Sequence, residues 1–124
     1  MRRPNDLSLA SWPVMFAGRE AAADALSPGL STQVQGDLDF LKANWPKTLP
    51  GGAIHADLFP DNTFFLDGKL SGVIDFYFAC SDFLAYDIAV CLNAWCFERR
   101  GEYNLTKGRA LISSYETVRR LEPR

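Results

Sequence analysis

The residue types best suited to chemistry lie close together in the middle of the chain. His55, Asp57 and Asn62 share one short segment, and Asp75 follows it. A carboxylate can orient a hydroxyl group and accept its proton. Carboxylate and amide oxygens together suit a hard divalent cation such as Mg²⁺. These residues predict phosphoryl transfer, because that reaction needs a proton acceptor beside the nucleophile and oxygen ligands for the metal on the phosphates.

The spacing of three of these residues agrees with the catalytic loop of protein kinases, H-R-D-x-x-x-x-N. His55, Asp57 and Asn62 occupy its fixed positions, while Ala56 stands in place of the Arg. Asp75 follows two predicted strands, where kinases carry the Asp of D-F-G. Each residue by itself would be commonplace. The joint order of loop, hairpin, aspartate and apolar helix is much more specific.

The residue types indicate a role for each position. Asp57 is expected to be the catalytic base, and Asn62 and Asp75 are expected to bind the cofactor ATP through its Mg²⁺. His55 is the second catalytic candidate. We expect its ring to bond to backbone and hold the loop in shape, because Mg²⁺ prefers oxygen ligands to nitrogen.

Two further aspartates are expected to support these groups from behind. Asp87 lies in an otherwise apolar stretch. A buried carboxylate needs hydrogen-bond donors, and the backbone of the catalytic loop is the expected source. Asp82 precedes the same stretch and is expected to cap a helix there. Asp61 and Asp67 are expected to be a loop cap and a turn residue.

Hydrophobic periodicity predicts the elements that position these residues. Helices are expected from Ser8 or Ser11 to residue 26 and over residues 31–44, followed by a loop at 50–52. Strands over 63–66 and 70–74 are joined by Asp67-Gly68, a strong hairpin signal. A buried helix over 83–97 and a last helix over 106–121 complete an α+β fold. The catalytic loop is assigned to residues 54–62 and the metal-binding hairpin to 63–76.

Composition narrows the classes of protein to which the chain can belong. The 124 residues are 48% hydrophobic and 23% charged, with a net charge of −2, as expected for one globular domain. No basic run predicts binding to nucleic acid or a membrane. Three cysteines without a C-x-x-C pair, and a single histidine, argue against zinc. A divalent-metal hydrolase that uses His55 and the aspartates is a weaker alternative to a kinase, because such an enzyme normally needs more than one histidine. The odd cysteine count favours the cytoplasm.

Three segments resemble a known family. Residues 54–62 (IHADLFPDN), 71–80 (SGVIDFYFAC) and 86–97 (YDIAVCLNAWCF) are similar to the aminoglycoside phosphotransferase and choline kinase group. Within that group they most resemble bacterial homoserine kinases of the protein-kinase-like type. The likeness extends through residues 44–46 and 115–119. It implies ATP-dependent phosphorylation of the small molecule L-homoserine, a step of threonine biosynthesis.

The resemblance also implies a two-lobed fold with ATP between the lobes. No G-x-G-x-x-G motif and no strand lysine precede the catalytic loop in this sequence. Residues 1–124 are therefore expected to form one domain, part of the mainly helical C-terminal lobe, without the N-terminal lobe. Alone, the chain is expected to turn over little ATP. An apolar face is expected to be exposed where the missing lobe would dock, and this face is expected to bind that lobe or a second copy of the chain. A non-catalytic relic, an interaction module or a related aminoglycoside- or choline-type kinase remain alternatives.

Overall fold

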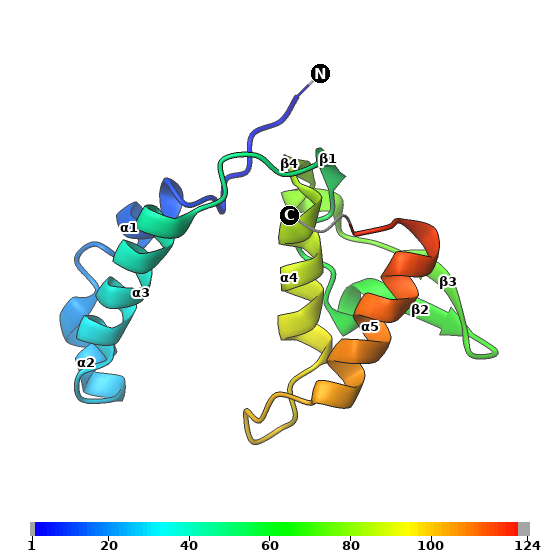
Figure 1. Ribbon diagram of the computed structural model, residues 1–124. Coiled ribbons are helices and arrows are strands. Elements are labelled where there is room, and N and C mark those ends of the chain that lie inside the picture. Colours follow the sequence, from blue (N-terminus) through cyan, green and yellow to red (C-terminus); the bar gives the residue numbers. More distant parts are fainter. Residues whose placement is uncertain (1, 122–124) are drawn as a thin grey trace. The chain divides into compact units, whose positions relative to one another are not determined.

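The protein is described by a computed structural model that covers residues 2–121 (Figure 1). The chain divides into two compact units. The first, Asn5–Leu49, contains only helices, and we call it the helical unit. The second comprises residues 2–4 and 50–121, and we call it the mixed unit because it contains strands and helices. The α+β class is confirmed, and the single domain over residues 1–124 stays a prediction.

The helical unit contains one more helix than expected. The structure has α1 (Ser11–Phe16) and α2 (Glu20–Leu26) where a single helix was predicted. Gly18 separates them with a φ of +78°, a left-handed conformation that ends a helix and that glycine adopts without steric cost. The prediction was wrong because the apolar positions keep the same spacing across this break.

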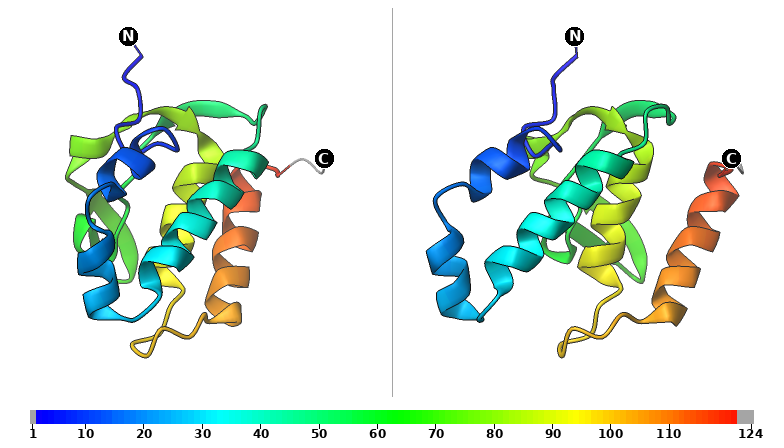
Figure 2. Two further views of the ribbon diagram at one scale, coloured as in Figure 1. Left: turned by 90° about the vertical axis from the view of Figure 1, so that its left-hand side faces the viewer. Right: turned by 60° about the vertical axis from the view of Figure 1, so that its left-hand side comes forward.

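The predicted second helix is confirmed as α3 (Leu30–Asn44). Asp24 joins α2 to its first turn, accepting hydrogen bonds from the Ser31 backbone nitrogen at 2.9 Å and the Ser31 hydroxyl at 2.6 Å. These bonds, chiefly that from the hydroxyl, lower the pKa of the Asp24 carboxyl. They satisfy a free N–H group at the start of α3, and α2 lies beside α3 (Figure 2).

The mixed unit contains a strand pair that periodicity did not reveal. β1 (Gly51–Ile54) pairs antiparallel with β4 (Cys80–Phe83). The Gly51-Gly52 dipeptide was expected to be a loop, and the helix that follows β4 was expected to begin at Phe83. Both expectations were wrong, because Gly51, Gly52 and Phe83 belong to short segments that become strands only through pairing with each other across the sequence. On its other side, β4 donates the Ser81 N–H to the Arg3 carbonyl oxygen at 2.8 Å.

The predicted hairpin is confirmed as β2 (Thr63–Leu66) and β3 (Lys69–Val73). Asp67 and Gly68 have φ values of +50° and +73°, and two successive positive values define the tight turn that suits twisted strands. The register shifts between Phe64 and Phe65, which marks a bulge in the pair.

The two predicted C-terminal helices are also confirmed, with shorter bounds. They are α4 (Leu84–Trp95) and α5 (Leu105–Val118), which contact each other and run side by side in Figures 1 and 2. Asn104 caps α5 by accepting the Lys107 N–H at 3.0 Å. Ile88 is the one buried residue of α4, so this helix is less enclosed than its apolar sequence predicts.

The core of the mixed unit lies next to the catalytic segment. Ile54, Ala56 and Cys80 are buried together, and α4 packs on the same β1–β4 pair. Partly buried side chains close the cluster: Phe78, Leu84 and Tyr86. The end of β1 is therefore held firmly where the catalytic loop begins. Over residues 2–121, no helix combines the length and hydrophobicity needed to cross a membrane.

Candidate functional site

The catalytic loop begins where β1 ends and closes with the short 3₁₀ turn η1 (Pro60–Asn62). Its first residues, His55 and Ala56, are buried. Ala56 has a φ of +64°, a left-handed conformation that costs a non-glycine residue roughly 1–2 kcal/mol. Such a conformation persists only when surrounding contacts hold it. The loop therefore needs an anchor at this point.

Asp87, on the first turn of α4, is that anchor. One carboxylate oxygen accepts the His55 N–H at 3.1 Å, and the other accepts the Ala56 N–H at 2.8 Å. The left-handed turn at Ala56 aims both N–H groups at the same carboxylate. These are the donors that the sequence analysis expected for Asp87. A functional role for Asp87 stays a prediction.

Asp57 and Asn62 are in direct contact at the two ends of the loop. The Asn62 amide nitrogen donates to the Asp57 carboxylate at 3.1 Å and to the Asp57 carbonyl oxygen at 2.8 Å. Asn62 is buried, whereas Asp57 is half-buried. Because the nitrogen faces Asp57, the amide oxygen of Asn62 is the atom directed to other partners. The spacing of D-x-x-x-x-N thus corresponds to a closed loop.

Ile74 connects this loop to Asp75. Its N–H donates to the Asn62 carbonyl oxygen at 3.0 Å, and its own carbonyl oxygen lies 2.9 Å from His55 Nε2. A carbonyl can only accept, so Nε2 carries the ring hydrogen. His55 Nδ1 is buried and has no partner among the described residues. The ring therefore bonds to backbone, as expected, and it holds the segment before Asp75 against the loop.

Asp75 follows Ile74 in a left-handed conformation, with a φ of +58°. Its carboxylate accepts the Tyr77 N–H at 3.3 Å and caps the turn η2 (Phe76–Phe78). The Phe76 ring lies 4.8 Å from the His55 ring, measured between centroids. Asp75 is exposed, so its second carboxylate oxygen faces solvent-accessible space beside the loop.

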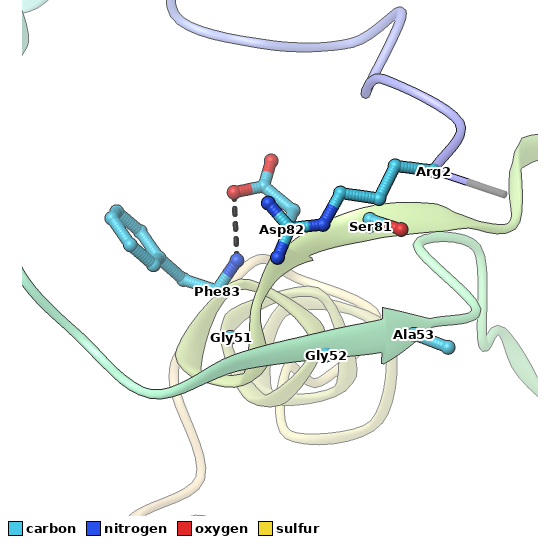
Figure 3. A pocket seen from close by; sticks show the side chains of 7 residues that line it. All are labelled: Arg2, Gly51, Gly52, Ala53, Ser81, Asp82 and Phe83. Atoms are coloured by element: carbon cyan, nitrogen blue, oxygen red, sulfur yellow. Dashed lines mark hydrogen bonds between the residues drawn. The ribbon is translucent and has the colours of Figure 1, made fainter.

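Asp82 lies apart from these residues. It belongs to β4, opposite Gly52, and its carboxylate accepts the Phe83 N–H at 2.7 Å (Figure 3). Phe83, and not Asp82, is the N-cap of α4, so the expected capping position was wrong. Asp82 lines a pocket of about 480 Å³ whose other lining residues are Arg2, Gly51, Gly52, Ala53, Ser81 and Phe83. The catalytic-loop candidates do not line this pocket.

Sequence reasoning missed a second contact between α4 and the loop. The indole N–H of Trp95 donates to the Leu58 carbonyl oxygen at 2.8 Å, and the ring packs edge-on against Phe65 with centroids 6.4 Å apart. Periodicity assigned Trp95 only to an apolar face. The available signal was its spacing of eight residues from Asp87, which places both on one broad face of α4.

The charge of Asp87 also affects a neighbouring thiol. Burial, then the negative charge of Asp87 and then Cys96, raise the pKa of Cys91 to about 11. Cys80 and Cys96 are buried, and neither forms a disulfide bond with a described residue. All three cysteines therefore have the character of packed side chains.

The oxygen atoms at the loop fit Mg²⁺ better than a softer metal. Asn62 offers an amide oxygen and Asp75 a carboxylate, both hard donors. Within residues 2–121, no group of three or more His, Cys, Asp or Glu side chains is arranged to hold an ion. Mg²⁺ bound to a nucleotide takes most of its ligands from phosphate and water and needs only one or two from protein. This donor set agrees with that requirement.

Comparison with known proteins finds a matching family and similar curated relatives. Residues 3–123 match the model of the phosphotransferase enzyme family. The chain is 64% identical over 121 residues to a homoserine kinase of Xanthobacter autotrophicus, covering 98% of this chain and 38% of the relative. Homoserine kinases of Rhizobium rhizogenes and Rhizobium meliloti are 60% and 59% identical over 121 residues, with 98% of this chain and 38% and 37% of the relatives covered.

The chain thus spans somewhat more than a third of the length of these curated relatives. The family match covers nearly every residue, including both units and the whole catalytic loop. On this match, the chain belongs to the phosphotransferase enzyme family.

Proposed function

We propose that this chain supplies the catalytic loop and metal ligands of an ATP-dependent kinase that phosphorylates the hydroxyl group of L-homoserine. One observation carries the proposal. Asp57 and Asn62 are hydrogen-bonded to each other, and Ile74 bonds to Asn62 and His55 so that Asp75 comes next to them. This arrangement supports the proposal, because phosphoryl transfer requires a base and oxygen ligands close to one another. The printed names of the relatives support homoserine as the substrate.

Each residue of the site has a distinct part in this reaction. Asp57 orients the substrate hydroxyl and accepts its proton as the oxygen attacks the terminal phosphate, and ADP leaves. The Asn62 amide oxygen and the Asp75 carboxylate would hold Mg²⁺. When bound, the metal neutralises the charge on the phosphates. His55 and Asp87 keep the backbone on either side of these groups in place. Asp82, on β4, is given no part in the chemical step.

We further propose that the chain corresponds to part of the C-terminal lobe of a kinase-like fold. The hairpin, the catalytic loop and the helices α4 and α5 support this, because they follow one another in the order that kinases use. The groups that cover the ATP phosphates would then come from the part of the relatives' length that this chain does not span. The substrate would be a small cytoplasmic metabolite, with no nucleic acid or membrane as partner.

The experiment uses a chimera in which this chain replaces the matching segment of the Xanthobacter homoserine kinase. With ATP, Mg²⁺ and homoserine, the chimera should form O-phosphohomoserine, measured by mass spectrometry. Asp57→Asn should lower kcat by roughly 10²–10⁴-fold, because a general base contributes about that much. Its affinity for ATP, measured by calorimetry, should stay unchanged.

Asp61→Asn is the matched control, since Asp61 is exposed in the same loop and bonds to none of the site residues. It should leave kcat within twofold of the parent chimera. A folded parent chimera that phosphorylates an aminoglycoside or choline but not homoserine would refute the substrate. A near-normal kcat in Asp57→Asn would remove Asp57 from the role of base.

A further inference from the structure

The helix α4 contacts the catalytic loop at two places, one on each side of Asp57. Near its start, Asp87 accepts the N–H groups of His55 and Ala56. At its end, Trp95 donates its indole N–H to the Leu58 carbonyl oxygen at 2.8 Å. Eight helical residues span about 12 Å, so the two contacts brace the loop at well-separated points.

The second contact acts on the peptide between Leu58 and Phe59, one residue beyond Asp57. Leu58 is half-buried, and a buried carbonyl without a hydrogen bond is costly. The Asp57 carbonyl oxygen already accepts the Phe59 N–H at 2.8 Å and the Asn62 amide at 2.8 Å. With Leu58 held as well, successive carbonyls after Asp57 are fixed. The direction of the Asp57 side chain then depends on both ends of its backbone.

Trp95 is itself well placed to be rigid. Its ring is half-buried and packs edge-on against Phe65 of β2, with an interplanar angle of 72°. Aromatic pairs of this geometry are stabilising beyond the area that they bury. The indole therefore ties the catalytic loop to both α4 and the metal-binding hairpin.

We infer that Trp95 is a positioning residue for phosphoryl transfer, acting through the Leu58 carbonyl to keep Asp57 aimed at the substrate hydroxyl. This inference rests on the proposed function. It assigns to Trp95 no contact with ATP or homoserine. Small displacements of a reacting group can cost up to about 10²-fold in rate without weakening substrate binding. The expected signature is a lower kcat with unchanged KM.

The more selective of the two variants removes only the N–H group. Replacing the Trp95 indole by benzothiophene keeps the bicyclic shape and substitutes sulfur for the N–H, and Trp95→Phe is the simpler variant. In the chimera, both should lower kcat about tenfold and leave the KM values for ATP and homoserine within twofold. In this chain alone, amide hydrogen exchange over residues 57–62 should accelerate about tenfold, while α4 keeps its protection.

Trp45→Phe is the matched control, because Trp45 pairs edge-on with Trp12 inside the helical unit. It should change neither kcat nor loop exchange. Wild-type kcat and loop exchange in the benzothiophene variant would overturn the inference. A variant in which kcat falls, both KM values rise and the melting temperature drops would also overturn it, because that combination is the mark of a purely structural role. A parent chimera without homoserine kinase activity refutes the proposed function instead, and the loop exchange in this chain still tests the Trp95 contact.

Discussion

Replacing Asp87 by asparagine should loosen the catalytic loop while leaving the size of the side chain unchanged. The carboxylate accepts two backbone N–H groups, from His55 at 3.1 Å and Ala56 at 2.8 Å. An amide has one acceptor oxygen, so Asp87→Asn keeps one bond and turns an NH₂ group toward the other N–H.

The size of the effect follows from the bonds that are lost. A hydrogen bond to a charged group contributes about 1.5–3 kcal/mol, and a buried donor left without a partner adds to the loss. The left-handed backbone at Ala56 would lose its support at the same time. We expect the free energy of unfolding of the mixed unit to fall by about 2–3 kcal/mol.

Urea unfolding followed by circular dichroism measures this loss, and amide hydrogen exchange locates it at residues 55 and 56. Asp61→Asn makes the same chemical change at an exposed position and should alter the free energy of unfolding by less than about 0.5 kcal/mol. If Asp87→Asn were as mild as this control, and exchange at residues 55 and 56 stayed slow, the carboxylate would not be the anchor of the loop.

Two further predictions concern helix packing and thiol ionisation. Gly36→Ala should raise the free energy of unfolding by up to about 1 kcal/mol, because an added methyl group on α3 meets no atom within 4 Å. Gly108→Ala on α5 should instead lower the free energy of unfolding by about 1 kcal/mol, because the methyl group would overlap the Tyr103 ring. Urea unfolding measures both changes, and stabilisation by both substitutions would contradict this packing. Alkylation of Cys91 by iodoacetamide, quantified by mass spectrometry, should reach half its maximal rate near pH 11 in the native protein. In the unfolded chain the thiol has its ordinary pKa of 9.0, so the contribution of Cys91 to stability should fall as pH rises from about 9 to about 11. A half-maximal alkylation rate near pH 9 in the native protein would show that burial and Asp87 do not raise the pKa of Cys91.

Local sequence determined the features of this protein that depend on neighbouring residues. The hairpin was predictable because Asp67-Gly68 accepts the two positive φ values that its turn requires. The helices α3, α4 and α5 were predictable from apolar residues that recur at helical spacing. Within the site, the H-x-D-x-x-x-x-N spacing already predicted a loop over residues 54–62, and the unusual Asp87 in an apolar stretch implied a backbone partner.

Only the tertiary structure decided the contacts between residues distant in sequence. The pairing of β1 with β4, the placement of Asp82 on that pair, and the bond from Trp95 to Leu58 are all long-range. A strand of four residues has no periodicity strong enough to identify it, and its formation depends on the partner that it meets. The motif of the catalytic loop could therefore be recognised in the sequence, whereas the contacts of α4 with His55, Ala56 and Leu58 form only when the chain folds back on itself.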